Sequence, residues 1–314
     1  MTEPPRARDP RVAGRPVSPM RKGGTLDIVI FGLITGSVIL LSSVGFALIV
    51  KVEGFLNIAH GQMLLLGAYL GLWLSNAGLP IVLAALGAAL LTGAVGALLY
   101  GVLFRPVKAR GTLVLLFTSV GAAYVIYGLV GAAAGKRMLA YDLPPVRAIQ
   151  LFGEPFMTPY ELAIVAVALL SALAIHLFMT LTTMGKSIRA VSDNEELARA
   201  RGIDPLRSSY LVWFAASALG GLAGVFLGIM GSLHLAMGWQ QIIIILATTV
   251  LGGLGSLYGV MLAAFVLAFG IELGLLVVEP SYRSALAFLI IIVVLLIRPR
   301  GLQSLWGGGA ARAH

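Results

Sequence analysis

Long apolar segments separated by short polar ones run along almost the whole chain. A membrane-spanning helix takes about 20 predominantly apolar residues, and the stretches 55–104 and 208–271 contain no Asp, Glu, Lys or Arg at all. Only a bilayer accommodates such runs, so the pattern predicts an all-α, polytopic transmembrane helical bundle. The apolar segments cover residues 28–50, 55–75, 79–104, 112–134, 160–182, 208–231, 241–278 and 285–297.

Two of these segments carry signals of broken helices. Segment 241–278 is too long for one simple helix, and Gly252, Gly253 and Gly255 interrupt it, which predicts a short half-helix followed by a full span. Segment 55–75 begins with a polar, helix-poor stretch at residues 53–62, and residues 238–241 have the same character. Polar, Gly-containing starts in corresponding halves of a chain are typical of transporters built from inverted repeats.

The charged loops predict an orientation. Basic residues are concentrated at 105–110, 184–207 and 298–300, so the positive-inside rule places these loops in the cytoplasm together with the N-terminal tail. The Pro-rich loop 135–158 then lies outside. Three apolar segments separate the tail from residue 105, and three crossings cannot begin and end on one side. We therefore expect the second segment to re-enter the membrane without crossing it.

Composition supports a membrane protein and excludes several other classes. The chain is 59% hydrophobic and 11% charged, against about a quarter charged in an ordinary soluble domain. Its net charge of +9 comes from basic residues at the ends of apolar runs rather than from a basic stripe, so nucleic-acid binding is not expected. There is no Cys, which excludes disulfides and thiolate metal sites. The predicted domains are a disordered basic tail (1–24), a transmembrane domain (25–302) and a C-terminal tail (303–314).

The loop 184–207 is longer and more helical in pattern than a simple connection between spans requires. Its first part has Ile188 and Val191 on one face of a short helix. In its second part Ser192 is predicted to cap another helix, with Glu195 completing a capping box and Gly202 ending the helix. The loop is either a solvated surface helix or a docking element for a soluble cytoplasmic partner.

Several motifs resemble one transport family. Residues 195–204 (EELARARGID) resemble the acidic-Ala-spacer-Gly-Ile loop by which importer permeases contact their ATPases. Residues 56–62 (LNIAHGQ) followed by 67–69 (GAY) resemble a signature of the branched-chain amino acid permease family. Residues 250–256 (VLGGLGS) and 298–302 (RPRGL) resemble the same family in the expected order, so the resemblance extends over most of the chain.

This resemblance implies a type II ABC importer permease. Such a permease would carry a branched-chain amino acid, another amino acid, or urea or a short amide across the inner membrane. The implied partners are two cytoplasmic ABC ATPases, a second permease subunit that is identical or different, an extracytoplasmic solute-binding protein, and lipid. The chain itself needs no cofactor, because ATP and Mg belong to the ATPases. The residues implied for ATPase coupling are Ser187, Arg189, Glu195, Glu196, Ala198, Gly202 and Asp204; those for the translocation pathway are Asn57, His60, Gly61, Gln62, Tyr69, Gln240 and Gln241.

Some of these polar residues also have a structural interpretation. Asn57 and His60 either line the solute path or satisfy backbone groups freed at the broken helix start. Gln62 and Tyr69, at helical spacing beyond them, are compatible with ordinary interhelical contacts. Glu272 is the only carboxylate well inside an apolar segment and is a functional candidate, although its position allows it to reach the membrane interface instead.

Two other functional classes have less support. A secondary carrier driven by H⁺ or Na⁺ needs a titratable or ion-coordinating cluster in the membrane, and the sequence offers only Glu272. A membrane enzyme needs paired carboxylates, a metal cluster or an activated nucleophile, and none is visible. His176 and His234 have no partners at metal-ligand spacing, and the chain contains no phosphate-binding loop. The chain is therefore expected to be a transporter subunit without enzymatic activity.

Overall fold

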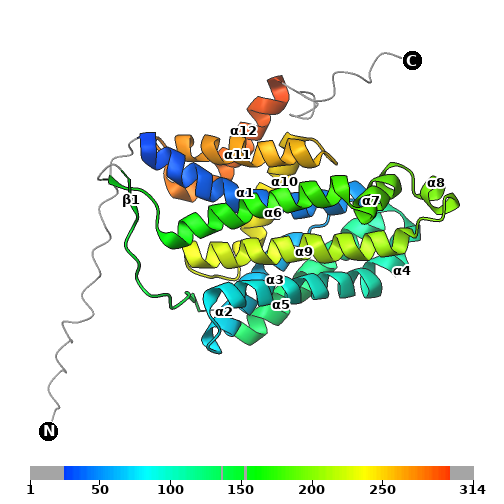
Figure 1. The fold of residues 1–314 in the computed structure, drawn as a ribbon, viewed down its shortest axis with the longest axis horizontal. Helices are drawn as coiled ribbons and strands as arrows, with labels where there is room; N and C mark the ends of the chain where they lie inside the picture. Colours follow the sequence, from blue (N-terminus) through cyan, green and yellow to red (C-terminus); the bar gives the residue numbers. More distant parts are fainter. Residues whose placement is uncertain (1–24, 136, 152–153, 298–314) are drawn as a thin grey trace, which may run out of the picture.

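The computed structural model describes residues 25–135, 137–151 and 154–297, so the predicted tails and the motif at 298–302 lie outside the described residues. The described chain folds into a helical bundle (Figure 1). Its elements are α1 (Thr25–Glu53), α2 (His60–Asn76), α3 (Ile81–Leu99), the π-helical turn η2 (Tyr100–Phe104), α4 (Arg105–Val107), the 3-10 turn η3 (Lys108–Arg110), α5 (Thr112–Ala134), β1 (Gln150–Leu151), β2 (Glu154–Pro155), α6 (Pro159–Leu181), α7 (Thr183–Asp193), α8 (Glu195–Ala200), α9 (Pro205–Met230), α10 (Met237–Gly252), α11 (Leu257–Gly274), the 3-10 turn η4 (Pro280–Tyr282) and α12 (Arg283–Ile297).

Within the described residues, 6 helices are long and apolar enough to cross a bilayer, and α10 and α12 add shorter apolar helices. The predicted break in segment 241–278 is confirmed, because α10 ends at Gly252 and α11 begins at Leu257. Gly253 and Gly255 between them have φ values of +97° and +86°, which only glycine adopts at little cost. The candidate spans are Asp27–Glu53, Ile81–Arg110, Thr112–Ala134, Pro159–Leu181, Pro205–Met230 and Leu257–Gly274.

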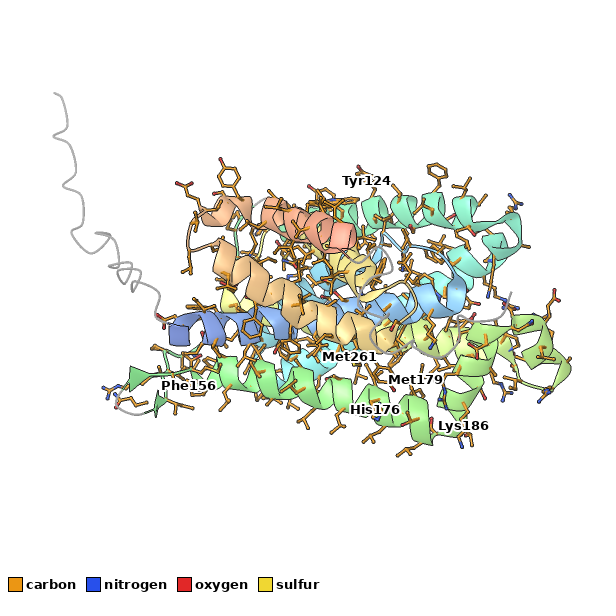
Figure 2. The ribbon with its side chains drawn as sticks, turned by 90° about the horizontal axis from the view of Figure 1, so that it is seen from above. Tyr124, Phe156, His176, Met179, Lys186 and Met261 are labelled. Atoms are coloured by element: carbon orange, nitrogen blue, oxygen red, sulfur yellow. The ribbon has the colours of Figure 1, made fainter. Side chains whose placement is uncertain are left out.

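The bundle has two ends, which we name the α8 end and the β1 end after the elements found there (Figure 1). Figure 2 shows Phe156 at the β1 end and Lys186 at the α8 end, joined by the length of α6. Helix α1 runs between the same two ends. Ile30 near its start packs with Met157, whereas Glu53 at its last turn pairs with Lys108 near α8.

The start of α1 lies at the β1 end, opposite loop 184–207. The N-terminal tail, which the sequence predicted to share a face with that loop, lies outside the described residues. The direction of α1 does overturn the prediction that the second segment re-enters without crossing. Residues 54–59 are non-helical and start near the α8 end, and α2 continues to the β1 end. The chain therefore passes between the two ends three times from the start of α1 to residue 105. Because three is an odd number, these two points lie at opposite ends of the bundle.

Helix α9 lies in the middle of the bundle, where small residues let its neighbours approach closely (Figure 1). A Cβ added at Gly67 of α2 would lie 2.2 Å from the Cα of Gly221 in α9, and one added at Gly224 would lie 2.0 Å from the carbonyl oxygen of Leu64. On the other side of α9, a Cβ at Gly96 of α3 would meet Ser217 at 2.0 Å. Glycines at helix interfaces give the backbone-to-backbone packing expected of membrane helices.

This packing predicts that Gly67→Ala destabilises the protein. The new methyl group would meet the backbone of Gly221, and overpacking of this kind costs about 1–3 kcal/mol. Thermal unfolding of the detergent-solubilised protein should show a lower melting temperature. Gly128→Ala in α5 is the matched control, because nothing lies within 4 Å of a Cβ there. An unchanged melting temperature for Gly67→Ala would contradict the close approach of α2 and α9.

Tyr141, in the segment between α5 and β1, covers α2 and α9 near the β1 end. Its hydroxyl donates a hydrogen bond to the carbonyl oxygen of Ala68, at 2.8 Å, and its ring lies beside Gly228. Burial raises the pKa of the Tyr141 phenol above its ordinary value, so the hydroxyl remains a donor into the alkaline range as well as at neutral pH. The same region is held by an isolated antiparallel bridge between Leu139 and Leu233.

Candidate functional site

Two helices begin inside the bundle, each after a non-helical stretch that we name its lead-in. The α2 lead-in is residues 54–59 and the α10 lead-in is residues 231–236. Helix α2 runs from its lead-in towards the β1 end, where Tyr141 binds it, and α10 runs the opposite way, towards the turn that leads into α11. The two broken helices are thus oppositely directed, which is the arrangement that inverted repeats produce.

The α2 lead-in satisfies much of its own backbone. The Asn57 side-chain oxygen accepts a hydrogen bond from the Ala59 amide at 3.2 Å, and the Ile58 amide donates to the Ser119 hydroxyl of α5 at 3.1 Å. Gly54, with a φ of +71°, allows the turn away from α1. The geometry therefore supports a role for Asn57 in satisfying backbone groups at the broken helix start rather than in lining the solute path.

His60, the first residue of α2, is fully buried. Its Nε2 lies 3.0 Å from the carbonyl oxygen of Ser42 in α1, an acceptor, so this nitrogen donates and carries the proton. Its Nδ1 has no hydrogen-bond partner in the described part of the chain. His60 therefore ties the start of α2 to α1 while keeping one acceptor unused.

The starts of α2 and α10 touch each other. A Cβ added at Gly61 would lie 2.5 Å from the carbonyl oxygen of Gly238, and one at Gly238 would lie 2.6 Å from Oε1 of Gln62. Gln62 is fully buried, and neither its Oε1 nor its Nε2 has a hydrogen-bond partner among the described residues. An unpaired buried polar group costs about 1–3 kcal/mol. The junction of α2 and α10 thus combines tight glycine packing with an unsatisfied amide.

The remaining predicted pathway residues lie around this junction rather than in it. Tyr69 is buried two turns further along α2 and packs against Trp73, and its hydroxyl has no partner within the described ranges. Gln240 is exposed, with its Oε1 3.1 Å from Nε2 of His234 in the α10 lead-in. Gln241 is half-buried and lines a small cavity together with Arg283.

Glu272 lies in an apolar helix, where a carboxylate is stable only with a basic or hydrogen-bonding partner, and it has such partners. Its carboxylate pairs with Arg283 of α12 and accepts a hydrogen bond from the hydroxyl of Thr35 in α1, at 2.9 Å. This contact joins α1, α11 and α12 near the β1 end. The structural interpretation of Glu272 is therefore supported, although the sequence did not identify Arg283 as its partner.

At the α8 end, α7 and α8 form a helical elbow between α6 and α9. Ile188 and Val191 are buried on the inner face of α7, as predicted, and Ala198 is buried in α8. The prediction that Ser192 caps α8 is wrong, because α7 continues through it to Asp193 and the Ser192 hydroxyl bonds the Arg189 carbonyl oxygen. Asn194 is the N-cap instead: its side-chain oxygen accepts from the Leu197 amide at 2.9 Å.

Apart from Ala198 and Glu195, the residues predicted for ATPase coupling divide into a group that shapes the elbow and a group that is exposed. Gly202, with a φ of +80°, ends α8, and Asp204 caps α9 by accepting from the Leu206 amide at 3.0 Å. Ser187 bonds the Thr183 carbonyl oxygen within α7. These residues shape the elbow. Arg189 and Glu196 are exposed, as is Leu197, which is 54% exposed and was not predicted as a site residue.

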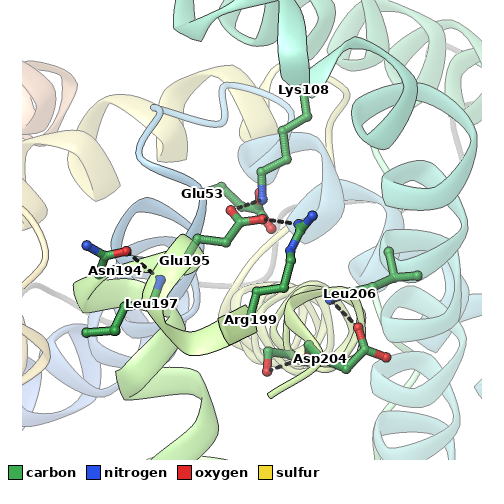
Figure 3. A network of polar contacts seen from close by, with 9 residues as sticks. Glu53, Lys108, Asn194, Glu195, Leu197, Arg199, Asp204 and Leu206 are labelled. Carbon is green, nitrogen blue, oxygen red and sulfur yellow. Dashed lines mark hydrogen bonds and ion pairs between the residues drawn. The ribbon is translucent and has the colours of Figure 1, made fainter. Parts of the chain in front are cut away.

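Glu195 belongs to a charge network that joins the elbow to the rest of the bundle (Figure 3). Lys108 Nζ lies 3.0 Å from Glu53 Oε2 at the end of α1 and 3.2 Å from Glu195 Oε2, and Arg199 pairs with the other oxygen of Glu195 at 3.1 Å. The sequence marked 105–110 as a basic loop but contained no sign that Lys108 pairs with two distant carboxylates.

Metal chemistry has no support in the described residues, which contain no group of three or more His, Asp or Glu side chains able to hold a metal ion. His176 pairs with the Tyr258 hydroxyl at 2.8 Å instead. The site thus consists of a broken-helix junction inside the bundle and a charged elbow at one end. Both are typical of a transporter rather than of an enzyme.

Comparison with known proteins supports the same interpretation. Residues 28–295 match the family described as "Branched-chain amino acid transport system / permease component". The chain belongs to this permease family. Membership makes it a multi-pass membrane subunit of an ABC transport system that has no catalytic activity or cofactor of its own, since partner ATPases bind ATP.

Relatives match nearly the whole length of the permease. It is 26% identical to the high-affinity branched-chain amino acid transport system permease protein LivH of Escherichia coli, over 86% of this chain and 92% of the relative. It is 28% identical to the corresponding protein BraD of Pseudomonas aeruginosa, over 88% and 95%. A chain of PsaBC from Streptococcus pneumoniae in complex with Fab has the same fold, with a TM-score of 0.50 and 18% identity over 89% and 95%. The predicted fold class is confirmed.

Proposed function

We propose that this permease imports branched-chain amino acids across the inner membrane, driven by two cytoplasmic ATPases that contact the α7–α8 elbow. The observation that carries this proposal is the elbow itself. It presents exposed Arg189, Glu196 and Leu197 away from the bundle, while its inner face is anchored by Ile188, Val191 and Ala198. A connection between α6 and α9 needs no such structure unless a partner binds it.

This assignment sets the orientation. If the α8 end faces the cytoplasm, the β1 end faces outward, and so does the start of α1. The extracytoplasmic solute-binding protein then docks at the β1 end, where Tyr141 and the bridge between Leu139 and Leu233 close the bundle. The basic residues at 105–110 and 184–207 remain cytoplasmic, in agreement with the positive-inside rule.

We assign the solute pathway to the junction of α2 and α10. In the present arrangement Gly61 and Gly238 are in contact, and the Gln62 amide has no partner among the described residues, as expected of a closed gate. Separation of the two helix starts would give this amide water or solute to bind, which favours opening. Gln62 and His60 are the pathway residues with the strongest support. Asn57 satisfies the backbone of the α2 lead-in, and Tyr69 packs against Trp73 within α2.

The second permease subunit is proposed to cover the surface formed by α5 and the start of α10. The ring of Trp239 lies beside that of Tyr124 at the middle of α5, with ring centroids 5.0 Å apart and planes tilted by 48°, so this surface lies near mid-membrane depth. Gln240 is exposed there, and parts of the non-helical lead-in are exposed next to it. Polar side chains and irregular backbone are not tolerated against lipid. Tyr124, 62% exposed, lies on the outer surface of α5 (Figure 2).

Uptake by reconstituted vesicles tests the proposal. Vesicles that contain the permease with its ATPases, second permease and binding protein should accumulate labelled leucine, isoleucine or valine only when ATP is present on the side of the ATPases. Hydrolysis-deficient ATPases should abolish accumulation. Uptake at full rate with such ATPases, dependent on a proton or sodium gradient, would instead support an ion-coupled secondary transporter. Competition by urea or amides would redefine the solute.

A further inference from the structure

We propose that Lys108 is the positioning residue that transmits movement of the α8 elbow to the broken start of α2. The proposal rests on the proposed function, because it assumes that ATPases move α7 and α8. Lys108 touches neither solute nor ATPase surface in this role. It acts through two carboxylates, one in the elbow and one at the end of α1.

The first observation is that one ammonium group bridges two elements far apart in sequence. Lys108 Nζ contacts Glu53 at 3.0 Å and Glu195 at 3.2 Å (Figure 3). Glu53 is only 2% exposed at its side chain, and its second oxygen has no hydrogen-bond partner within the described ranges. A buried carboxylate held by one cation follows that cation when it moves, because separating the pair leaves an uncompensated charge.

The second observation is the local backbone around Lys108. The chain passes from α3 through the π-helical η2, the short α4 and the 3-10 turn η3 within residues 100–110. Changes of helix type within one span often mark functional hinges. Gly111, with a φ of +98°, then ends the distorted region before α5. Lys108 is thus mounted on a segment whose geometry can adjust without unfolding a regular helix.

The third observation is the route of the chain after Glu53. The next residue, Gly54, turns the chain into the α2 lead-in. The lead-in is followed directly by His60 and Gly61 at the start of α2, in the junction with α10. The lead-in is also fastened to α5 through Ile58 and Ser119. A displacement of α8 therefore reaches the proposed gate by a short physical path, which runs from Glu195 through Lys108 and Glu53 to the lead-in.

Other charged groups face the same site and limit alternatives. Arg199 pairs with Glu195 but lies on α8 itself, and Arg105 lines the groove beside Lys108. Tyr100 of η2 lines a neighbouring pocket together with Lys108 and Glu195. Among the ion pairs of the described residues, Lys108 alone connects α8 to α1.

The test is the ratio of solute imported to ATP hydrolysed in vesicles with the full complex. Lys108→Met should keep ATPases bound and hydrolysis running while uptake per ATP falls about tenfold, a typical coupling between distant sites. Lys108→Arg should recover most of this loss, because a guanidinium can also bridge two carboxylates. Arg110→Met is the matched control: it removes one exposed positive charge from the same turn, and its uptake per ATP should equal that of the wild type.

A purely structural role for Lys108 predicts a different pattern. Uptake and hydrolysis would then fall together, in proportion to the folded complex recovered, and that result would overturn the proposal. If Lys108→Met yields too little complex, Glu195→Ala decides. It removes the acceptor for Lys108 on α8 but leaves Glu53 paired with Lys108, and normal uptake per ATP in it would refute the proposal. Failure of the wild-type complex to use ATP would refute the proposed function instead.

Discussion

Gly238→Leu is expected to stop uptake almost completely while the permease still folds and binds its ATPases. A Cβ at this position would lie 2.6 Å from Oε1 of Gln62 and 2.9 Å from the carbonyl oxygen of Gly61, so a leucine cannot be added while α2 and α10 touch. The larger side chain forces the two helix starts apart and destabilises the closed arrangement. Overpacking of about 1–3 kcal/mol in one state alone shifts the equilibrium between states by about 5- to 150-fold.

Gly231→Leu is the matched control for this substitution. Gly231 begins the same lead-in, its φ of −155° is open to any residue, and a Cβ there meets nothing closer than the Leu227 carbonyl oxygen at 3.8 Å. Uptake rates and melting temperatures should be measured for both variants. Equal uptake by Gly238→Leu and wild type would show that the junction is not part of the gate. A matching loss in both variants would point to general damage of the lead-in.

Replacing the exposed acidic and apolar side chains on the outer face of α8 is expected to prevent assembly with the ATPases. Glu196 and Leu197 are exposed at the tip of the elbow, and neither side chain takes part in the α8 cap or in the Lys108 bridge, because the cap uses only the backbone amide of Leu197. The double substitution Glu196→Lys and Leu197→Asp changes charge and removes an apolar contact. Central interface residues are often worth about 2 kcal/mol or more, which corresponds to at least about a 30-fold loss of affinity.

Co-purification of the ATPases with the tagged permease measures this effect. The control is Asp142→Lys, an exposed charge reversal in the segment before β1, at the opposite end of the bundle. It should leave the ATPases bound. ATPases that co-purify normally with the α8 variant would remove the basis for assigning the elbow as the docking element, whatever the effect on uptake.

The lengths of the apolar runs were sufficient to predict most of the helices. Segment 112–134 coincides with α5, and the break at Gly252 was visible because consecutive glycines interrupt an otherwise apolar run. These features depend on local composition and on the bilayer, which the sequence encodes directly. The Asn194 cap was missed because both Ser192 and Asn194 fit a helix start, and only the packing of α7 through residue 193 selects between them.

The number of crossings was harder to predict. Charge counting placed the tail on the side of the basic loop at 105–110, so one of the three apolar segments before that loop was expected not to cross. The second segment was chosen because of its polar start, although the α2 lead-in is the first part of a crossing. Long-range pairs were equally inaccessible. Neither Lys108 with Glu53 nor Glu272 with Arg283 can be predicted from spacing, because each depends on how distant helices pack.

The sidedness of the elbow tests the account most directly, and the absence of cysteine from the chain makes the measurement simple. Leu197→Cys and Asp142→Cys place single thiols at the α8 end and the β1 end. With a membrane-impermeant thiol reagent, the Leu197→Cys protein should react only from the cytoplasmic side and be protected when the ATPases are bound. The Asp142→Cys protein should react only from outside. Labelling of Leu197→Cys from outside, or without protection by bound ATPases, would contradict the account.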